Sequence, residues 1–128
     1  MILLDTCSLY WWTLAPEGLS KHALKRISDS NSDPILVSSI SIWEIGWKAK
    51  QGKLQLPCSI SEYLQRLESV RQIKIIPVTA ALWVRVVEMN WSHRDPADRI
   101  IVATAEREKA ILLTEDSEIQ NFYPHCEW

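Results

Sequence analysis

Short continuous runs of apolar residues alternate with longer segments in which apolar residues recur at helical spacing. A continuous apolar run is typical of a strand that is buried on both faces of a parallel sheet. We expect such strands at residues 1–4, 35–38, 74–77 and 111–113. We expect helices at residues 8–14, 20–28, 41–51, 60–70, 79–90 and 96–109, followed by one helical turn and an edge strand in the tail 117–128. This alternation predicts an α/β three-layer sandwich, with a mainly parallel sheet of four to five strands between layers of helices.

The length and composition of the chain fit one globular domain over residues 1–128. A chain of 128 residues, 47% of them hydrophobic, is long enough to bury a core, and it contains no repeat, low-complexity tract or linker. The formal net charge is only −2, so the surface as a whole does not attract nucleic acid or an anionic membrane. Any contact with nucleic acid therefore has to rest on a local group of basic residues.

Cysteine usage and the N-terminal segment indicate a cytoplasmic protein. The three cysteines lie far apart, form no CxxC motif and are odd in number, which argues against a disulfide framework. Together with the three histidines they show no zinc-ligand spacing. The first residues lack a basic leader, and no segment is long and apolar enough for a membrane span. We therefore expect a protein of the reducing cytosol without a membrane partner.

The most informative stretch is SHRDPADRIIVATA, residues 92–105, where a polar cluster adjoins a run that has to be buried. Asp95 followed by proline predicts a helix start, with Asp95 as the N-cap. Asp98 then lies in the first helical turn, where an acid either interacts with the helix dipole or serves a function. The same two interpretations apply to Glu44, because Ser41 and Glu44 have the spacing of a capping box. These stretches alone leave both interpretations open.

Other acids directly follow predicted strands. Asp5 ends the first strand and Asp116 follows the fourth, and the carboxyl ends of parallel strands share the edge of the sheet where ligands bind. Glu44, near the start of the helix after the second strand, is expected at the same edge. The position of Asp98 is the least determined, because its helix leads back to the fourth strand. If the connection before that helix crosses the same edge, four carboxylates meet there.

Four carboxylates in one cleft need a counterion or shared protons. Each pair of like charges repels by roughly a kcal/mol even at water-like screening, and a bound cation or a raised pKa relieves this repulsion. A site made only of carboxylates suits the hard cations Mg²⁺ and Mn²⁺. Such sites are typical of phosphate chemistry, in which the metal polarises a phosphoryl oxygen and makes hydroxide available near neutral pH.

Four blocks of the sequence resemble the PIN domain, and within that family the VapC-type toxins of bacterial toxin–antitoxin pairs. The blocks are LLDT with Asp5, SIWEIGWK with Glu44, HRDPADR with Asp98, and LLTED with Asp116. Each block alone is weak, whereas their order and spacing over the whole chain are specific. The resemblance implies a PIN-like fold and a metal-dependent endoribonuclease that cleaves a phosphodiester with activated water and leaves a 5′-phosphate. It also implies a homodimer and a cognate VapB-type antitoxin whose tail enters a groove of the toxin.

The resemblance also implies roles for the individual acids. Asp5 and Asp98 are the expected principal ligands of Mg²⁺ or Mn²⁺. Glu44 is expected to complete the coordination or to position a water. Asp116 is expected to bind a second ion or to act through water, and it is the weakest of the four assignments.

Smaller polar residues beside these acids are expected to support them. Thr6 and Thr114 are expected to hydrogen-bond the carboxylates, and Asp95 is expected to serve as the helix cap. Two positions depart from the family pattern, since Cys7 stands where relatives often have histidine and Ala97 where an aromatic residue is common. Neither departure removes a carboxylate, so both concern contacts with the substrate.

Local positive charge near these acids is expected to hold RNA. Arg94, Arg99 and Lys48 are the candidates, with Arg99 either paired with an acid or bound to a backbone phosphate. Lys50 and Lys53 extend the basic group, and ordinary solvation of lysines at a helix end is the alternative interpretation. Single-stranded loops are the expected target, because their bases can stack on aromatic rings.

Four of the tryptophans indicate a docking surface. Trp43 and Trp47 lie one helical turn apart, and together with Trp11 and Trp12 they are candidates for an apolar groove that binds an antitoxin helix. Burial in the core or in another interface is the alternative for each of them.

Two other functions fit parts of the sequence. One is a PIN-like binding module without catalysis, in which the acids only cap helices. The other is a phosphoaspartyl enzyme or receiver domain, in which an aspartate after a strand is the nucleophile. The second is disfavoured, because Asp5 has no neighbouring acid and no lysine ends a predicted strand.

Overall fold

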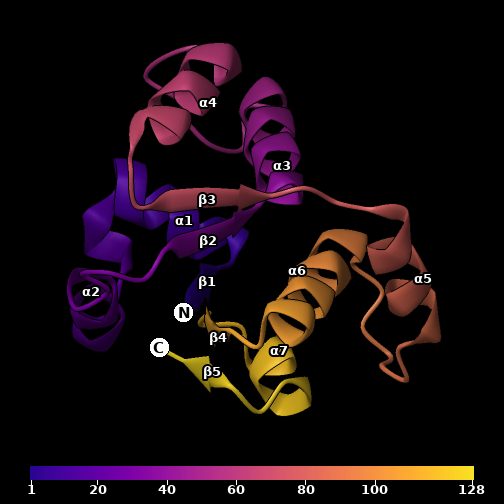
Figure 1. Cartoon of the computed structure of the whole chain (residues 1–128). Coiled ribbons are helices and arrows are strands. Elements are labelled where there is room, and N and C mark those ends of the chain that lie inside the picture. Colours follow the sequence, from indigo (N-terminus) through magenta and orange to yellow (C-terminus); the bar gives the residue numbers. More distant parts are fainter.

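The computed structural model describes all 128 residues and has a parallel sheet at its centre (Figure 1). The sheet has five strands in the order β3-β2-β1-β4-β5, and every neighbouring pair is parallel. The predicted α/β fold is confirmed, with a sheet that is wholly rather than mainly parallel. The strands are β1 (Ile2–Leu4), β2 (Ile35–Ser38), β3 (Ile73–Ile76), β4 (Ile111–Leu113) and β5 (Cys126–Glu127).

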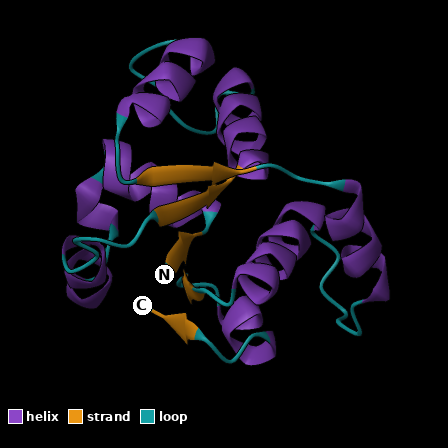
Figure 2. Cartoon of the chain, viewed as in Figure 1, coloured by secondary structure: helices purple, strands orange, loops and turns teal.

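Helices cover both faces of this sheet (Figure 2). Helices α5, α6 and α7 build one core with the sheet, and α1, α2 and α4 build the other. Helix α3 takes part in both, because Ile45 belongs to the second core while Ile40 packs against the first. The helices are α1 (Thr6–Leu14), α2 (Lys21–Ser28), α3 (Ser39–Lys50), α4 (Ile60–Ser69), α5 (Ala80–Glu88), α6 (Pro96–Glu108) and α7 (Ser117–Phe122), with a 3₁₀ turn at Pro16–Gly18.

The central strand shows why its sequence is continuously apolar. Leu3 of β1 faces the core with α6, while Ile2 and Leu4 face the opposite core, and all three are almost fully buried. Each such side chain contributes roughly 1.5–3 kcal/mol through burial. Both faces of β1 are therefore occupied by packing, and polar chemistry is possible only beyond its end at Asp5.

Two helices begin two residues earlier than the sequence pattern predicts. Helix α1 begins at Thr6 because the Asp5 side chain accepts the backbone N–H of Ser8 at 2.7 Å. Helix α3 begins at Ser39 because the Ser38 hydroxyl accepts the N–H of Ile40 at 3.3 Å. Glu44 consequently lies in the second turn of α3. The capping-box interpretation of Glu44 is wrong, and its carboxylate is available for another role.

The order of the strands places a crevice beside β1. From β1 the chain proceeds through β2 to β3 on one side, and β4 and β5 lie on the other side. Ligands in open parallel sheets bind at the carboxyl edge where the strand order reverses. Here that point lies between β1 and β4, where Leu4 is aligned with Leu113. Asp5 and Thr114 are the next residues, so the topology directs them to this crevice.

Candidate active site

The four acids expected to meet all line one cleft of about 460 Å³ at the carboxyl edge of the sheet. Asp5 comes from the end of β1, Glu44 from α3, Asp98 from the first turn of α6 and Asp116 from the residue before α7. Asp98, whose side of the sheet the sequence left undetermined, therefore lies with the others. The remaining lining residues are Thr6, Cys7, Lys48, Asp95, Glu115 and Ser117.

Asp5 forms the floor of the cleft and is 6% exposed. Burial raises the pKa of its carboxyl group, hydrogen bonds from Thr114 and Ser8 oppose this rise, and the nearby charge of Asp116 adds to it. A buried carboxylate that is close to another acid is stabilised by a cation. The environment of Asp5 therefore favours either a proton or a positive ion beside it.

Glu44 is held by neighbours on two helices. The Thr6 hydroxyl donates to its Oε1 at 2.5 Å, and the Ser41 hydroxyl lies 2.9 Å from the Thr6 oxygen. The Lys48 ammonium lies 3.4 Å from Oε2 of Glu44. Glu44 thus enters the cleft through contacts between side chains, which the sequence pattern did not reveal.

Asp98 has a partner that sequence reasoning missed. His93 Nε2 lies 2.7 Å from Oδ2 of Asp98, and the other ring nitrogen of His93 contacts the carboxylate of Glu118. Burial raises the pKa of Asp98 to about 6, the charges of Asp95 and Glu44 add to this, and His93 opposes it. The sequence feature that could have indicated this contact is the position of His93, which lies five residues before Asp98 and just before the start of the helix.

Asp95 and Asp116 both act as helix caps at this edge. Oδ1 of Asp95 accepts from the N–H groups of Ala97 at 2.9 Å and Asp98 at 3.2 Å. Oδ1 of Asp116 accepts from the N–H of Glu118 at 2.8 Å. With Asp5 capping α1, three helix N-termini meet the cleft. Their partial positive charge stabilises carboxylates and any bound phosphate.

The donor set of the cleft fits a hard divalent cation, but the side chains point to their own partners. No three of the Asp, Glu, His and Cys side chains are close enough to one another to form a group that holds a metal ion. The available ligand atoms are carboxylate oxygens, which suit Mg²⁺ and Mn²⁺. Cys7 does not compete, because burial and then the charge of Asp5 raise the pKa of its thiol to about 11. Coordination therefore requires rotation of these carboxylates within the cleft.

The three basic candidates occupy different places. Lys48 lines the cleft itself, whereas Arg94 is exposed in a neighbouring hollow. The guanidinium of Arg99 donates to four backbone carbonyl groups, so the expected pairing of Arg99 with an acid or a phosphate is wrong. Those acceptors are Trp91 at 2.6 Å, His93 at 2.8 Å, Val86 at 2.6 Å and Met89 at 3.2 Å.

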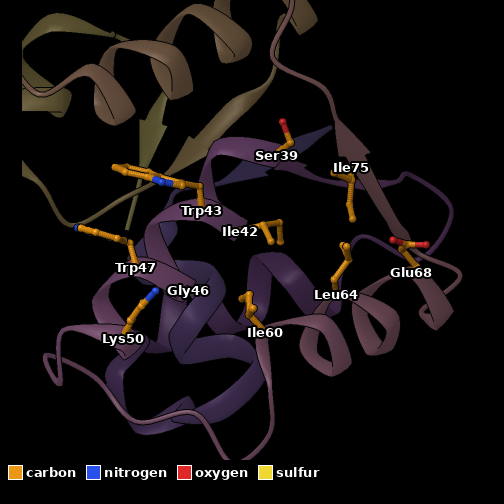
Figure 3. A pocket seen from close by; sticks show the side chains of 10 residues that line it. All are labelled: Ser39, Ile42, Trp43, Gly46, Trp47, Lys50, Ile60, Leu64, Glu68 and Ile75. Carbon is orange, nitrogen blue, oxygen red and sulfur yellow. The ribbon is translucent and has the colours of Figure 1, made fainter.

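Beside the cleft, α3 and α4 enclose an apolar groove of about 750 Å³ (Figure 3). Trp43 and Trp47 stand side by side along it, 57% and 47% exposed, with their ring centroids 6.4 Å apart. Trp11 and Trp12 do not line this groove. The ring of Trp11 instead lies beside the ring of Trp128, with the two ring centroids 5.5 Å apart, and Trp12 packs against the core. The expectation that all four tryptophans share a groove is therefore wrong for Trp11 and Trp12.

Comparison with known proteins identifies the class of this fold and site. Residues 2–123 match the PIN domain, and the chain therefore belongs to the PIN-domain family. The VapC-type resemblance is confirmed by a relative, Ribonuclease VapC22 of Mycobacterium tuberculosis. The two chains are 36% identical over 121 residues, which cover 94% of this chain and 90% of the relative.

Solved structures support the same fold. A toxin–antitoxin complex from Klebsiella pneumoniae contains a chain that is similar with a TM-score of 0.67 at 18% identity, covering 100% of this chain and 97% of that chain. The FitAcB structure from Neisseria gonorrhoeae is similar with a TM-score of 0.65 at 20% identity, covering 98% and 95% of the two chains. None of the helices of the present protein is long and apolar enough to cross a membrane.

Proposed function

We propose that this protein is an Mg²⁺- or Mn²⁺-dependent endoribonuclease and the toxin of a toxin–antitoxin pair. The observation that carries this proposal is the meeting of Asp5, Glu44, Asp98 and Asp116 in one cleft, although they come from four separate parts of the chain. The name of the relative in Mycobacterium tuberculosis, a ribonuclease, supports the same activity. We treat residues 1–128 as one domain that acts in the cytoplasm, where its three free cysteines stay reduced.

The acids would divide the work of holding the metal. Asp5 and Asp98 would be the principal ligands, Glu44 would complete the coordination or position the attacking water, and Asp116 would serve a second ion or act through water. The bound metal would supply a Lewis acid for the phosphoryl oxygen and hydroxide near neutral pH.

The other residues of the cleft would position the acids and the RNA. The hydroxyls of Thr6 and Thr114 hold the carboxylates of Glu44 and Asp5, and His93 fixes the direction of Asp98 through its 2.7 Å contact. The helix N-termini at the edge would hold the scissile phosphate. Lys48 would exchange its contact with Glu44 for a phosphate of the substrate.

The apolar groove is the proposed site of a VapB-type antitoxin segment. Exposed tryptophans that border a polar cleft are typical of protein interfaces, and one structural neighbour is a toxin–antitoxin complex. An amphipathic helix could place its apolar face between α3 and α4. A homodimer is proposed as well, and the exposed apolar residues Trp83, Val84 and Val87 of α5 offer it a surface.

A PIN-like binding module without catalysis is the second candidate. It is favoured by the capping contacts of Asp5, Asp95 and Asp116, which already give each of these carboxylates a structural role. It does not explain why Glu44 and Asp98 line the same cleft, because neither of them caps a helix.

Cleavage of RNA by three matched variants separates the two candidates. Asp5→Asn and Asp98→Asn are expected to lower Mg²⁺-dependent cleavage by more than about a hundredfold, and chelation by EDTA is expected to stop the wild type. Asparagine also caps helices, so Asp5→Asn should retain α1 and its circular dichroism spectrum.

Asp33→Asn is the control, because Asp33 lies before β2, at the opposite edge of the sheet. This variant is expected to keep full activity. Retention of cleavage by both cleft variants would refute the carboxylate mechanism and favour the binding module.

A further inference from the structure

A second hollow adjoins the acid cleft and shares a wall with it. Its volume is about 550 Å³, and His93 and Glu118 form part of its lining. One nitrogen of His93 contacts Asp98 in the cleft, and the other contacts Glu118. The two hollows therefore lie on either side of one hydrogen-bonded group. An RNA strand with a phosphate in the cleft can place a neighbouring base in this second hollow.

Three of the polar side chains around this hollow are free of partners within the chain. Ser92, Arg94 and Asn121 are exposed and make no side-chain hydrogen bond or ion pair with the protein. Glu118 uses one carboxylate oxygen for His93 and keeps the other available. Arg99, only five residues from Arg94, has its donors bound to backbone carbonyls. Of these two arginines, only Arg94 therefore has a guanidinium that is available to a ligand.

The walls of the hollow are held in place before any ligand binds. Trp91 and Phe122 stack with their centroids 4.6 Å apart, and His93 lies 4.8 Å from Trp91. The Arg99 guanidinium lies 6.0 Å from the Trp91 ring and fixes the carbonyls of Trp91 and His93. A rigid site loses less conformational entropy when it binds its ligand, so this hollow is suited to selective recognition.

We propose that this hollow binds a guanine base of the RNA substrate. The assignment rests on the proposed function and specifies the substrate of the same site. Guanine presents O6 and N7 as acceptors, and the guanidinium of Arg94 can donate to both at once. Its N1–H and N2 amino groups are donors, which suit the free oxygen of Glu118.

Adenine does not fit this set of groups as well. Its N6 amino group is a donor that would face the donors of Arg94, and it has no N1 hydrogen for Glu118. Single-stranded RNA exposes these base edges, whereas a duplex hides them.

Binding without hydrolysis tests the pocket independently of the metal chemistry. The probes are fluorescein-labelled oligouridine strands that carry one central guanosine, inosine or adenosine, measured by fluorescence anisotropy in EDTA. The wild type is expected to bind the guanosine strand about tenfold or more tightly than the adenosine strand. Inosine, which lacks the N2 amino group, is expected to fall between them.

Substitution of Arg94 tests which side chain produces the preference. Arg94→Met is expected to reduce the preference for guanosine over adenosine by about tenfold or more. Arg71→Met removes the same charge just before β3, at the opposite edge of the sheet, and is expected to leave the preference unchanged. Glu118→Gln is expected to weaken guanosine binding more than adenosine binding.

The outcomes distinguish a failed pocket from a failed nuclease. Equal binding of guanosine and adenosine strands, or an unchanged preference in Arg94→Met, overturns the guanine pocket whether or not RNA is cleaved. Guanosine preference without Mg²⁺-dependent cleavage supports the pocket and overturns the nuclease. If both hold, sequencing of cleaved RNA is expected to show guanosine at one fixed position relative to the cut.

Discussion

The two sides of α3 face different surroundings. Glu44 and Lys48 face the acid cleft, whereas Trp43 and Trp47, each one position earlier along the helix, face the apolar groove. In the cleft the carboxylates have hydrogen-bond partners, and no buried polar side-chain atom in the protein lacks one. In the groove, two large rings are about half exposed and lie nearly parallel to each other.

In the proposed function, this contrast separates the catalytic side of one rigid helix from its docking side. Successive side chains on a helix are separated by about 100°, so neighbouring positions can serve different surfaces. A partner in the groove would lie on the other side of this helix from the acids of the cleft. Substitutions on one side of α3 should therefore be separable from substitutions on the other.

The largest expected effect separates docking from cleavage. Joint substitution of Trp43 and Trp47 by alanine is expected to lower the affinity for the antitoxin by at least about a hundredfold, because large aromatic residues dominate interface energies. RNA cleavage should remain at the wild-type rate. Isothermal titration with the proposed VapB-type antitoxin checks the affinity.

Leu24→Ala is the control for that experiment, because Leu24 is 44% exposed on α2 and does not line the groove. It should leave antitoxin affinity unchanged. An equal loss in this control would place the antitoxin elsewhere, and loss of cleavage in the double variant would show that the two sides of α3 are coupled.

A smaller effect concerns the wall of the cleft. Arg99→Met leaves four backbone carbonyls without their donor and is expected to lower the free energy of unfolding by about 2 kcal/mol. Arg94→Met, at an exposed position, should change it by less than about 0.5 kcal/mol. Urea denaturation measures both, and equal stabilities would show that Arg99 does not hold this segment.

The smallest expected effect concerns how much the charge of Asp98 lowers the free energy of unfolding of the metal-free protein. Burial raises the pKa of Asp98 from 3.8 to about 6, so the folded protein binds this proton more tightly than the unfolded chain. The contribution of Asp98 to the free energy of unfolding therefore falls as the pH rises from about 3.8 to about 6 and beyond. Asp98→Asn is expected to stabilise the metal-free protein by about 1–2 kcal/mol near pH 7.5.

Denaturant titrations in EDTA measure that difference at two pH values. The advantage of Asp98→Asn should narrow near pH 4.5, where the wild-type carboxyl group in the folded protein is largely protonated. The amide oxygen of asparagine can still accept the hydrogen bond from His93. An advantage of the same size at both pH values would show that charge at Asp98 is not its cause.

The sequence predicted the layers of the fold and the places of Asp5 and Asp116 because both follow from local patterns. Continuous apolar runs identify buried parallel strands, and Asp5 and Asp116 are residues that come after two of them. Helix starts were less predictable, because Asp5 and Ser38 are the N-caps although later residues are also suitable N-caps in the sequence. The first turn of α3 shows the consequence, because a shift of two residues removed Glu44 from its predicted capping role.

Contacts between side chains of different elements were not predictable from the sequence. His93 reaches Glu118 across 25 residues of sequence, and no periodicity connects two such positions. Arg99 belongs to the same polar block as Asp98, yet it points to the carbonyls of the preceding segment. Trp11 likewise gave no signal that it would contact Trp128. Such pairings are set by tertiary packing.

The most direct test of the central claim is the location of Mn²⁺ by anomalous diffraction from crystals of the protein soaked in MnCl₂. We expect an anomalous peak in the cleft, about 2 Å from carboxylate oxygens of Asp5 and Asp98, with Glu44 or a water completing the coordination. Absence of manganese from the cleft at a concentration that supports RNA cleavage would contradict the shared metal site.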